Sequence, residues 1–168
     1  ILETHIHADH ISAANYIRQK LSGRIGVSKH IKEVYDNFSS IYKLSSDGLS
    51  HFDYFFDDDE NLEICGALAT ALYVPGHTPA DLAFKIGQHI FVGDTLFAKD
   101  VGTARCDFPG GSAEQLYQSI QKILSFEAAK ERVKDEYDMR QTRKLALSEY
   151  IKAKKGEVAE AAVTAKSA

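Results

Sequence analysis

The chain has 168 residues, which suits one domain, and carries 44% hydrophobic residues, 26% charged residues and a net charge of −4. This composition excludes a chain that is disordered throughout, and the lack of a basic stripe argues against nucleic acid as a partner. No apolar stretch is long enough to cross a bilayer, so no membrane association is expected.

The first part of the chain alternates helical and extended patterns. Apolar residues at helical spacing predict helices over residues 14–21 and, capped by Ser28, over residues 31–38. A brief strand is predicted between them at residues 25–27. Residues 45–60 are rich in Ser, Asp and Gly and are predicted to form a loop that ends in a solvated acidic turn.

Strand patterns dominate the middle of the chain. Apolar residues predict strands over residues 62–65 and 67–74, and the alternation in residues 82–86 predicts a half-buried strand. Residues 89–92 return as its hairpin partner. Cys65 lies inside an apolar run and is predicted to be a small buried hydrophobe. The two cysteines offer no disulfide framework, so we expect a reducing compartment, the cytoplasm or, in a eukaryote, the mitochondrial matrix.

The last predicted element of the domain is a helix. Residues 112–115 have the form of a capping box, and apolar residues recur at helical spacing as far as residue 124. From residue 127 the composition becomes charged and rich in Ala. We therefore predict a domain over residues 1–126 and a mostly helical tail over residues 127–168. Strands that alternate with helices predict an α/β or α+β sandwich.

The most informative segment is a His-rich turn that follows residues 1–4, which have the pattern of a strand end. His5, His7, Asp9 and His10 fall within six positions. Neutral imidazoles supply nitrogen donors to a metal ion, whereas protonated neighbours would repel one another. A surface turn with chance histidines is the alternative, and it explains less. Because the chain begins at this strand end, we expect the sequence to be a fragment of a longer protein.

One short turn cannot surround a metal ion, so further ligands must come from elsewhere in the chain. His77 in Pro-Gly-His-Thr and Asp94 in Val-Gly-Asp-Thr both follow predicted strands. Each preceding glycine allows a tight turn that directs the next side chain into a shared cleft. The sequence therefore predicts a metal site that uses His5, His77 and Asp94.

These three segments resemble the metallo-β-lactamase superfamily, particularly its glyoxalase II-like branch, over residues 1 to about 125. The resemblance implies an αββα sandwich, here lacking its first strands, with a metal cleft at one edge of the two sheets. In two-metal members the residues matching His5, His7 and His77 hold one ion, and those matching Asp9 and His10 hold the second. Asp94 would bridge the two ions. No histidine follows His89 to complete the second site, so the chain either has lost that segment or uses one metal.

A second resemblance favours one metal. Residues 93–97 and 102–111 are similar to the persulfide dioxygenase branch, whose members bind a single iron. The resemblance implies Fe²⁺ held by His5, His77 and Asp94, with open positions for substrate sulfur and dioxygen. The implied reaction oxidises glutathione persulfide to sulfite and glutathione. His7, Asp9 and His10 would then orient the ligands without binding the iron.

Arg105 and Asp107 lie in the segment that distinguishes this branch, and we expect them to shape the substrate side of the cleft, directly or through the structure of the loop. Two alternatives stay open. One is a hydrolase of the glyoxalase II type with two Zn²⁺ or mixed zinc and iron. The other is a truncated domain that binds metal without turnover. A partner chain, such as a second copy in a homodimer, could complete the missing sheet edge.

Overall fold

The structure is a computed structural model that describes residues 1–7, 12–43, 48–98 and 100–126. All of these fall within the contiguous unit Ile1–Ala129. Asp9 and His10 of the His-rich turn lie outside the described residues, as does the predicted tail, so the predicted domain boundary stays a prediction. In the part of the chain that is described, no helix combines the length and the apolar character needed to cross a membrane.

The secondary structure follows the predicted order with one added strand. The helices are α1 (Ala14–Leu21), α2 (Ile31–Tyr42) and α3 (Ala113–Leu124), and short 3₁₀ helices occur at Gly48–His51 and Gly93–Thr95. The strands are β1 (Gly26–Ser28), β2 (Tyr54–Phe56), β3 (Glu60–Ile64), β4 (Ala67–Tyr73), β5 (Leu82–Ile86) and β6 (His89–Phe91). Strand β2 falls inside the segment predicted to be a loop, so that part of the prediction was wrong.

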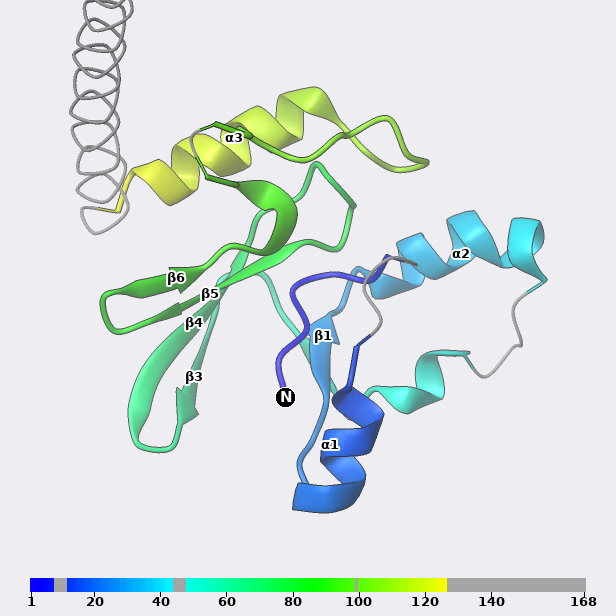
Figure 1. Cartoon of the computed structure of the whole chain (residues 1–168), viewed down its shortest axis with the longest axis vertical. Coiled ribbons are helices and arrows are strands. Elements are labelled where there is room, and N and C mark those ends of the chain that lie inside the picture. The colour runs from blue at the N-terminus through cyan, green and yellow to red at the C-terminus, as the bar shows by residue number, and fades with distance from the viewer. Residues whose placement is uncertain (8–11, 44–47, 99, 127–168) are drawn as a thin grey trace, which may run out of the picture. The chain divides into compact units, whose positions relative to one another are not determined.

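The strands form two sheets. In the smaller sheet β1 pairs in parallel with β2, and Leu2 forms a bridge to Gly26 on β1, so the first residues run beside β1 (Figure 1). In the larger sheet β3, β4, β5 and β6 form an antiparallel meander. Parallel β1 and β2 are separated by α2, as a crossover connection requires.

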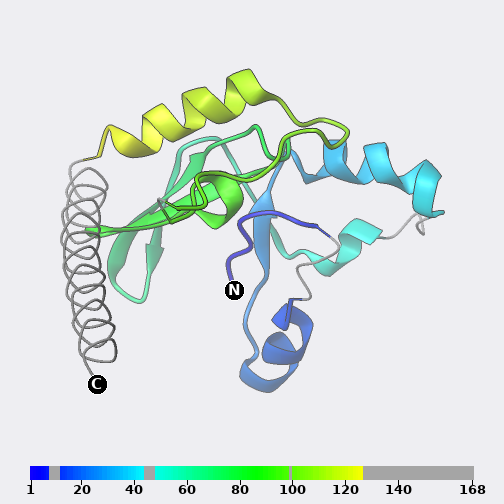
Figure 2. The same ribbon diagram turned by 45° about the horizontal axis from the view of Figure 1, so that its top comes forward.

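The core clusters establish the order of the layers. On one face of the larger sheet, Leu72, Val74 and Ala83 pack against Ile123 of α3. The opposite face carries Phe84, which packs with Phe56 of β2. The smaller sheet is covered in turn by α2, where Ile31 and Val34 pack against Val27. Figures 1 and 2 show α3 along one side of the larger sheet and α2 beside β1. The layers are therefore α3, larger sheet, smaller sheet, α2, and the predicted αββα sandwich is confirmed.

Two details of the sequence prediction were wrong for physical reasons. Leu82, Ala83 and Phe84 are all buried, because α3 covers Ala83 on the face of β5 that the predicted alternation left exposed. Cys65 is exposed, since it does not continue the strand but turns the chain with Gly66 at φ values of +50° and +82°. Two successive positive φ values are those of a tight hairpin turn between β3 and β4.

Candidate metal centre

His5 reaches the site on an extended segment that is held between the two sheets. The segment pairs with β1 through Leu2, and the carbonyl of Thr4 accepts a hydrogen bond of 2.8 Å from the backbone N–H of Leu82 at the start of β5. His5 is buried, with 3% of its surface exposed. Its Nε2 lies 3.6 Å from Oδ2 of Asp94, the second residue predicted to bind the metal.

His77 lies in the turn between β4 and β5, which α3 and its N-cap hold in place. Gly76 has a φ of +140° and lies against the backbone of Leu116 on α3, where an added Cβ would come within 2.2 Å of the Leu116 nitrogen. The carbonyl of Gly76 accepts a hydrogen bond from the N–H of Ser112, and the Ser119 hydroxyl donates to the carbonyl of Pro75. His77 is 3% exposed, so this turn delivers its ring into a buried position.

The hydrogen bonds of His77 determine which ring nitrogen carries the proton. Its Nδ1 lies 2.6 Å from the backbone carbonyl oxygen of Arg105. A carbonyl can only accept, so Nδ1 carries the hydrogen and Nε2 of the neutral ring has a lone pair. That Nε2 lies 3.4 Å from Oδ2 of Asp94 and 2.9 Å from Nδ1 of His7. His77 is therefore oriented as a nitrogen ligand.

Asp94 lies in the 3₁₀ helix that follows β6. Gly93 has a φ of +54°, and an added Cβ there would come within 2.7 Å of the Thr4 hydroxyl, so Gly93 allows the turn to approach the His-rich segment. The carboxylate of Asp94 is partly exposed, with 21% of its side-chain surface accessible. It therefore borders solvent, while His5 and His77 lie deeper.

His7 joins the same group of donors. Its ring centroid lies 4.5 Å from that of His77, 5.4 Å from that of His5 and 4.8 Å from that of Phe108. The sequence predicted that His7 would either orient the ligands of a single iron or, in a two-metal site, hold one ion together with His5 and His77. Its close approach to His77 leaves both of these roles open.

The donor set fits a transition metal. His5, His7 and His77 each offer a nitrogen, and these atoms lie within 4.8 Å of one another. An ion with bonds of about 2.0–2.2 Å to such ligands holds adjacent donors about 3.0–3.5 Å apart. The measured separations to Asp94 and between His7 and His77, 2.9 to 3.6 Å, are close to that range. Imidazole nitrogens with one carboxylate suit zinc and iron.

Arg105 and Asp107 form an ion pair with each other. The Arg105 guanidinium donates from Nε to Oδ1 at 2.6 Å and from Nη2 to Oδ2 at 2.8 Å, and it lies 4.5 Å from the ring centre of Phe108. This pairing lowers the pKa of Asp107 and raises that of Arg105. Both side chains are largely exposed. The segment therefore contacts the histidine donors through the Arg105 carbonyl and the Phe108 ring.

Asp81 was missed in the sequence and is part of the His77 turn. Its carboxylate is buried and accepts hydrogen bonds from the backbone N–H of Thr78 at 2.7 Å and from the Thr78 hydroxyl at 2.5 Å. Burial raises the pKa of Asp81 to about 6. The signal in the sequence was a Thr followed three residues later by an Asp in a turn, a spacing at which such side chains bond the local backbone.

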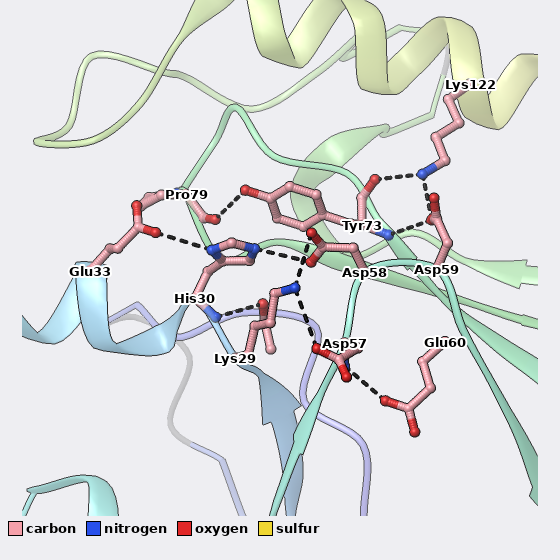
Figure 3. Close-up of polar contacts among 11 residues, drawn as sticks. Lys29, His30, Glu33, Asp57, Asp58, Asp59, Glu60, Tyr73, Pro79 and Lys122 are labelled. Carbon is pink, nitrogen blue, oxygen red and sulfur yellow. Dashed lines mark hydrogen bonds and ion pairs between the residues drawn. The ribbon is translucent and has the colours of Figure 1, made fainter.

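The other histidines that the structure describes, His30, His51 and His89, lie outside this group. His51 and His89 are exposed. His30 at the start of α2 is bonded by both ring nitrogens, at 3.0 Å each, to Glu33 and Asp58, and it stacks on Tyr73 (Figure 3). Figure 3 also shows Lys122 of α3 bonded to Asp59 and to the backbone carbonyl of Tyr73. This network joins α2, the β2–β3 turn, β4 and α3, so its role is structural.

Comparison with known proteins identifies the family. Residues 1–131 match the sequence profile of the Metallo-beta-lactamase superfamily. The chain belongs to this superfamily. A probable metallo-hydrolase of Burkholderia pseudomallei is 42% identical over 77% of this chain and 48% of its own length. Glyoxylase B2 of Dictyostelium discoideum is 47% identical over 74% of this chain and 44% of its own length.

Solved structures agree with this assignment. The crystal structure of ETHE1 from Myxococcus xanthus superposes with a TM-score of 0.56 and 27% identity over 73% of this chain and 46% of that protein. The chain spans about half the length of these relatives. In this metallo-β-lactamase-superfamily domain, His5 and His77 lie within 3.6 Å of the Asp94 carboxylate.

Proposed function

We propose that this chain is the metal-binding part of an iron-dependent persulfide dioxygenase. The proposed reaction combines glutathione persulfide, dioxygen and water to give glutathione and sulfite, so that the outer sulfur is oxidised and dioxygen is reduced. The observation that carries the proposal is the convergence of His5 Nε2, His77 Nε2 and Asp94 Oδ2 at one partly buried point. Two histidines and one carboxylate form the ligand set of mononuclear non-haem iron enzymes.

Iron bound there would supply redox chemistry with dioxygen and open coordination positions. The residues of the chain hold and tune that site. The Arg105 carbonyl fixes the proton of His77 on Nδ1 and leaves Nε2 as a donor. The Asp94 carboxylate would offset part of the charge of Fe²⁺, and His5 and His77 would bind it from buried positions. Hydrolysis would instead need a metal-activated water.

The segment that resembles persulfide dioxygenases contacts these donors directly, which supports the choice of this branch. Phe108 packs on the ring of His7, and the backbone of Arg105 bonds His77. Arg105 and Asp107 therefore lie on a segment that borders the site, and we propose that they shape its substrate side through the structure of this loop.

A binuclear thioester hydrolase of the glyoxalase II type is the second candidate. It is favoured by the third imidazole, since His7 Nδ1 lies only 2.9 Å from His77 Nε2 and within the donor group. The relative named as a probable metallo-hydrolase is also compatible with it. In that case His5, His7 and His77 would hold one ion of a pair, with zinc or mixed zinc and iron.

Metal analysis and two parallel activity assays separate the candidates. The dioxygenase predicts one iron per chain and oxygen uptake that depends on glutathione persulfide, with glutathione alone as the negative control. The hydrolase predicts two ions per chain and cleavage of S-lactoylglutathione without oxygen uptake. Retained metal without either activity would favour a metal-binding domain that has no turnover.

A further inference from the structure

The segment Thr103–Phe108 forms hydrogen bonds to both of the turns that carry His77 and Asp94. The Thr103 hydroxyl donates a 2.7 Å hydrogen bond to the carbonyl of Thr95, and the N–H of Ala104 lies 3.4 Å from the carbonyl of Asp94. The next residue, Arg105, places its own carbonyl on His77. Residues 103 and 104 thus bond the backbone of the Asp94 turn, and residue 105 bonds the ring of His77.

We infer that Arg105 and Asp107 are positioning residues, which hold the Arg105 carbonyl against His77 instead of contacting the substrate. This inference rests on the proposed role of His77 as a metal ligand. It does not depend on whether the site holds one ion or two, because His77 is a ligand in both cases.

The side chain of Arg105 is already engaged. Its Nε and Nη2 bond the two oxygens of Asp107 in a two-point pair, and one face of the guanidinium lies over Phe108. The pair carries no net charge, so it attracts an anionic substrate weakly. A planar fork held at two points restricts the rotation of Arg105, which restricts the backbone from which its carbonyl projects.

Phe108 extends the same restraint to the histidine rings of the site. Its ring lies 4.8 Å from His7 and 6.2 Å from His77, while Arg105 covers it at 4.5 Å. The turn from Cys106 to Gly111, which contains Phe108, is tight, because a Cβ on Gly111 would come within 2.3 Å of the Cys106 carbonyl oxygen. The side chains of Arg105 and Phe108 therefore restrain the segment, and the Arg105 carbonyl of that segment orients His77.

The test measures cobalt(II) binding, because the affinity and visible spectrum of cobalt report on its ligands without any turnover. Arg105→Ala removes the pair and the ring contact, Arg105→Lys keeps the charge but not the fork, and Asp107→Asn leaves the arginine charge in place. Loss of a group that orients a metal-bound histidine lowers metal affinity about ten- to a hundredfold. We expect a loss of about tenfold in all three variants, with an altered cobalt spectrum.

Arg18→Ala is the matched control, since Arg18 forms a partly exposed ion pair with Asp53 at 3.2 Å and also bonds His51 and Asn15, away from the metal donors. It should lower the melting temperature of the metal-free chain about as much as Arg105→Ala does, by a few degrees, and leave cobalt affinity unchanged. That comparison separates positioning of His77 from a general loss of stability.

Three outcomes would overturn the inference. Unchanged cobalt affinity and spectrum in Arg105→Ala, with a raised KM for glutathione persulfide, would show that Arg105 meets the substrate. Full rescue by Arg105→Lys would show that the charge, not the fork, matters. Absence of cobalt binding by the unaltered chain would overturn the metal site itself, and with it the proposed function. Loss of cobalt affinity in a chain that lacks oxygen uptake would support the inference while rejecting the dioxygenase.

Discussion

Replacement of Gly76 by alanine tests whether the packing of α3 against the β4–β5 turn holds His77 in place. The added Cβ would lie 2.2 Å from the nitrogen and 2.4 Å from the Cα of Leu116, and these are backbone atoms that cannot rotate away. Helix α3 cannot withdraw freely, because Ile123 at its other end is buried in the core. Backbone strain at a φ of +140° costs about 1–3 kcal/mol, and forced overpacking costs about the same again or more.

We therefore expect Gly76→Ala to lower the free energy of unfolding by about 3–5 kcal/mol in urea denaturation of the metal-free chain. Metal content should fall with it, because residue 76 directly precedes His77. Gly66→Ala is the control: Gly66 also has a positive φ, +82°, but its Cβ would meet nothing within 4 Å. That variant should lose about 1–2 kcal/mol and keep its metal. Equal losses in the two variants would refute the role assigned to the contact with Leu116.

Two further predictions test the histidine assignment and the buried carboxylate. His77→Ala should remove most of the bound metal, whereas His30→Ala should not, because His30 contacts Glu33 and Asp58 instead; equal loss in both would contradict the assignment. Burial raises the pKa of Asp81 from 3.8 to about 6, so the folded chain keeps this proton where the unfolded chain has lost it. Between about pH 4 and pH 6 the metal-free chain should lose about 3 kcal/mol of unfolding free energy from this group, and Asp81→Asn should abolish that loss; parallel pH curves would show the reasoning to be wrong.

The layers of the fold could be predicted from the sequence because they follow from local patterns. The Ser112 cap is one example: its side chain accepts the expected hydrogen bond from the N–H of Gln115 at the start of α3. Strand β2 was missed because it has three residues and follows a polar loop, so it depends on pairing with β1, a contact that local patterns do not show. Cys65 was placed in the core because hydrophobicity was given more weight than the turn potential of Cys-Gly.

The candidate site was predicted as a set of residues but not as a geometry. His5, His77 and Asp94 could be found because each has a distinctive local context, and the structure brings them together. The proton position on His77 could not be found, since it depends on a backbone carbonyl 28 residues away that has no sequence signature. The ion pair between Arg105 and Asp107 could not be predicted either, because the sequence does not show whether two residues of opposite charge bind each other or a substrate.

The number of metal ions bound by the unaltered chain, Asp9→Asn and Asp94→Asn tests most directly whether His5, His77 and Asp94 hold a single iron. For a mononuclear site we expect one iron in the unaltered chain and one in Asp9→Asn, although with weaker affinity, and none in Asp94→Asn, because the amide lacks the charge of the carboxylate. Two ions in the unaltered chain and one in Asp9→Asn would contradict the single-iron site and assign the chain to the binuclear hydrolases.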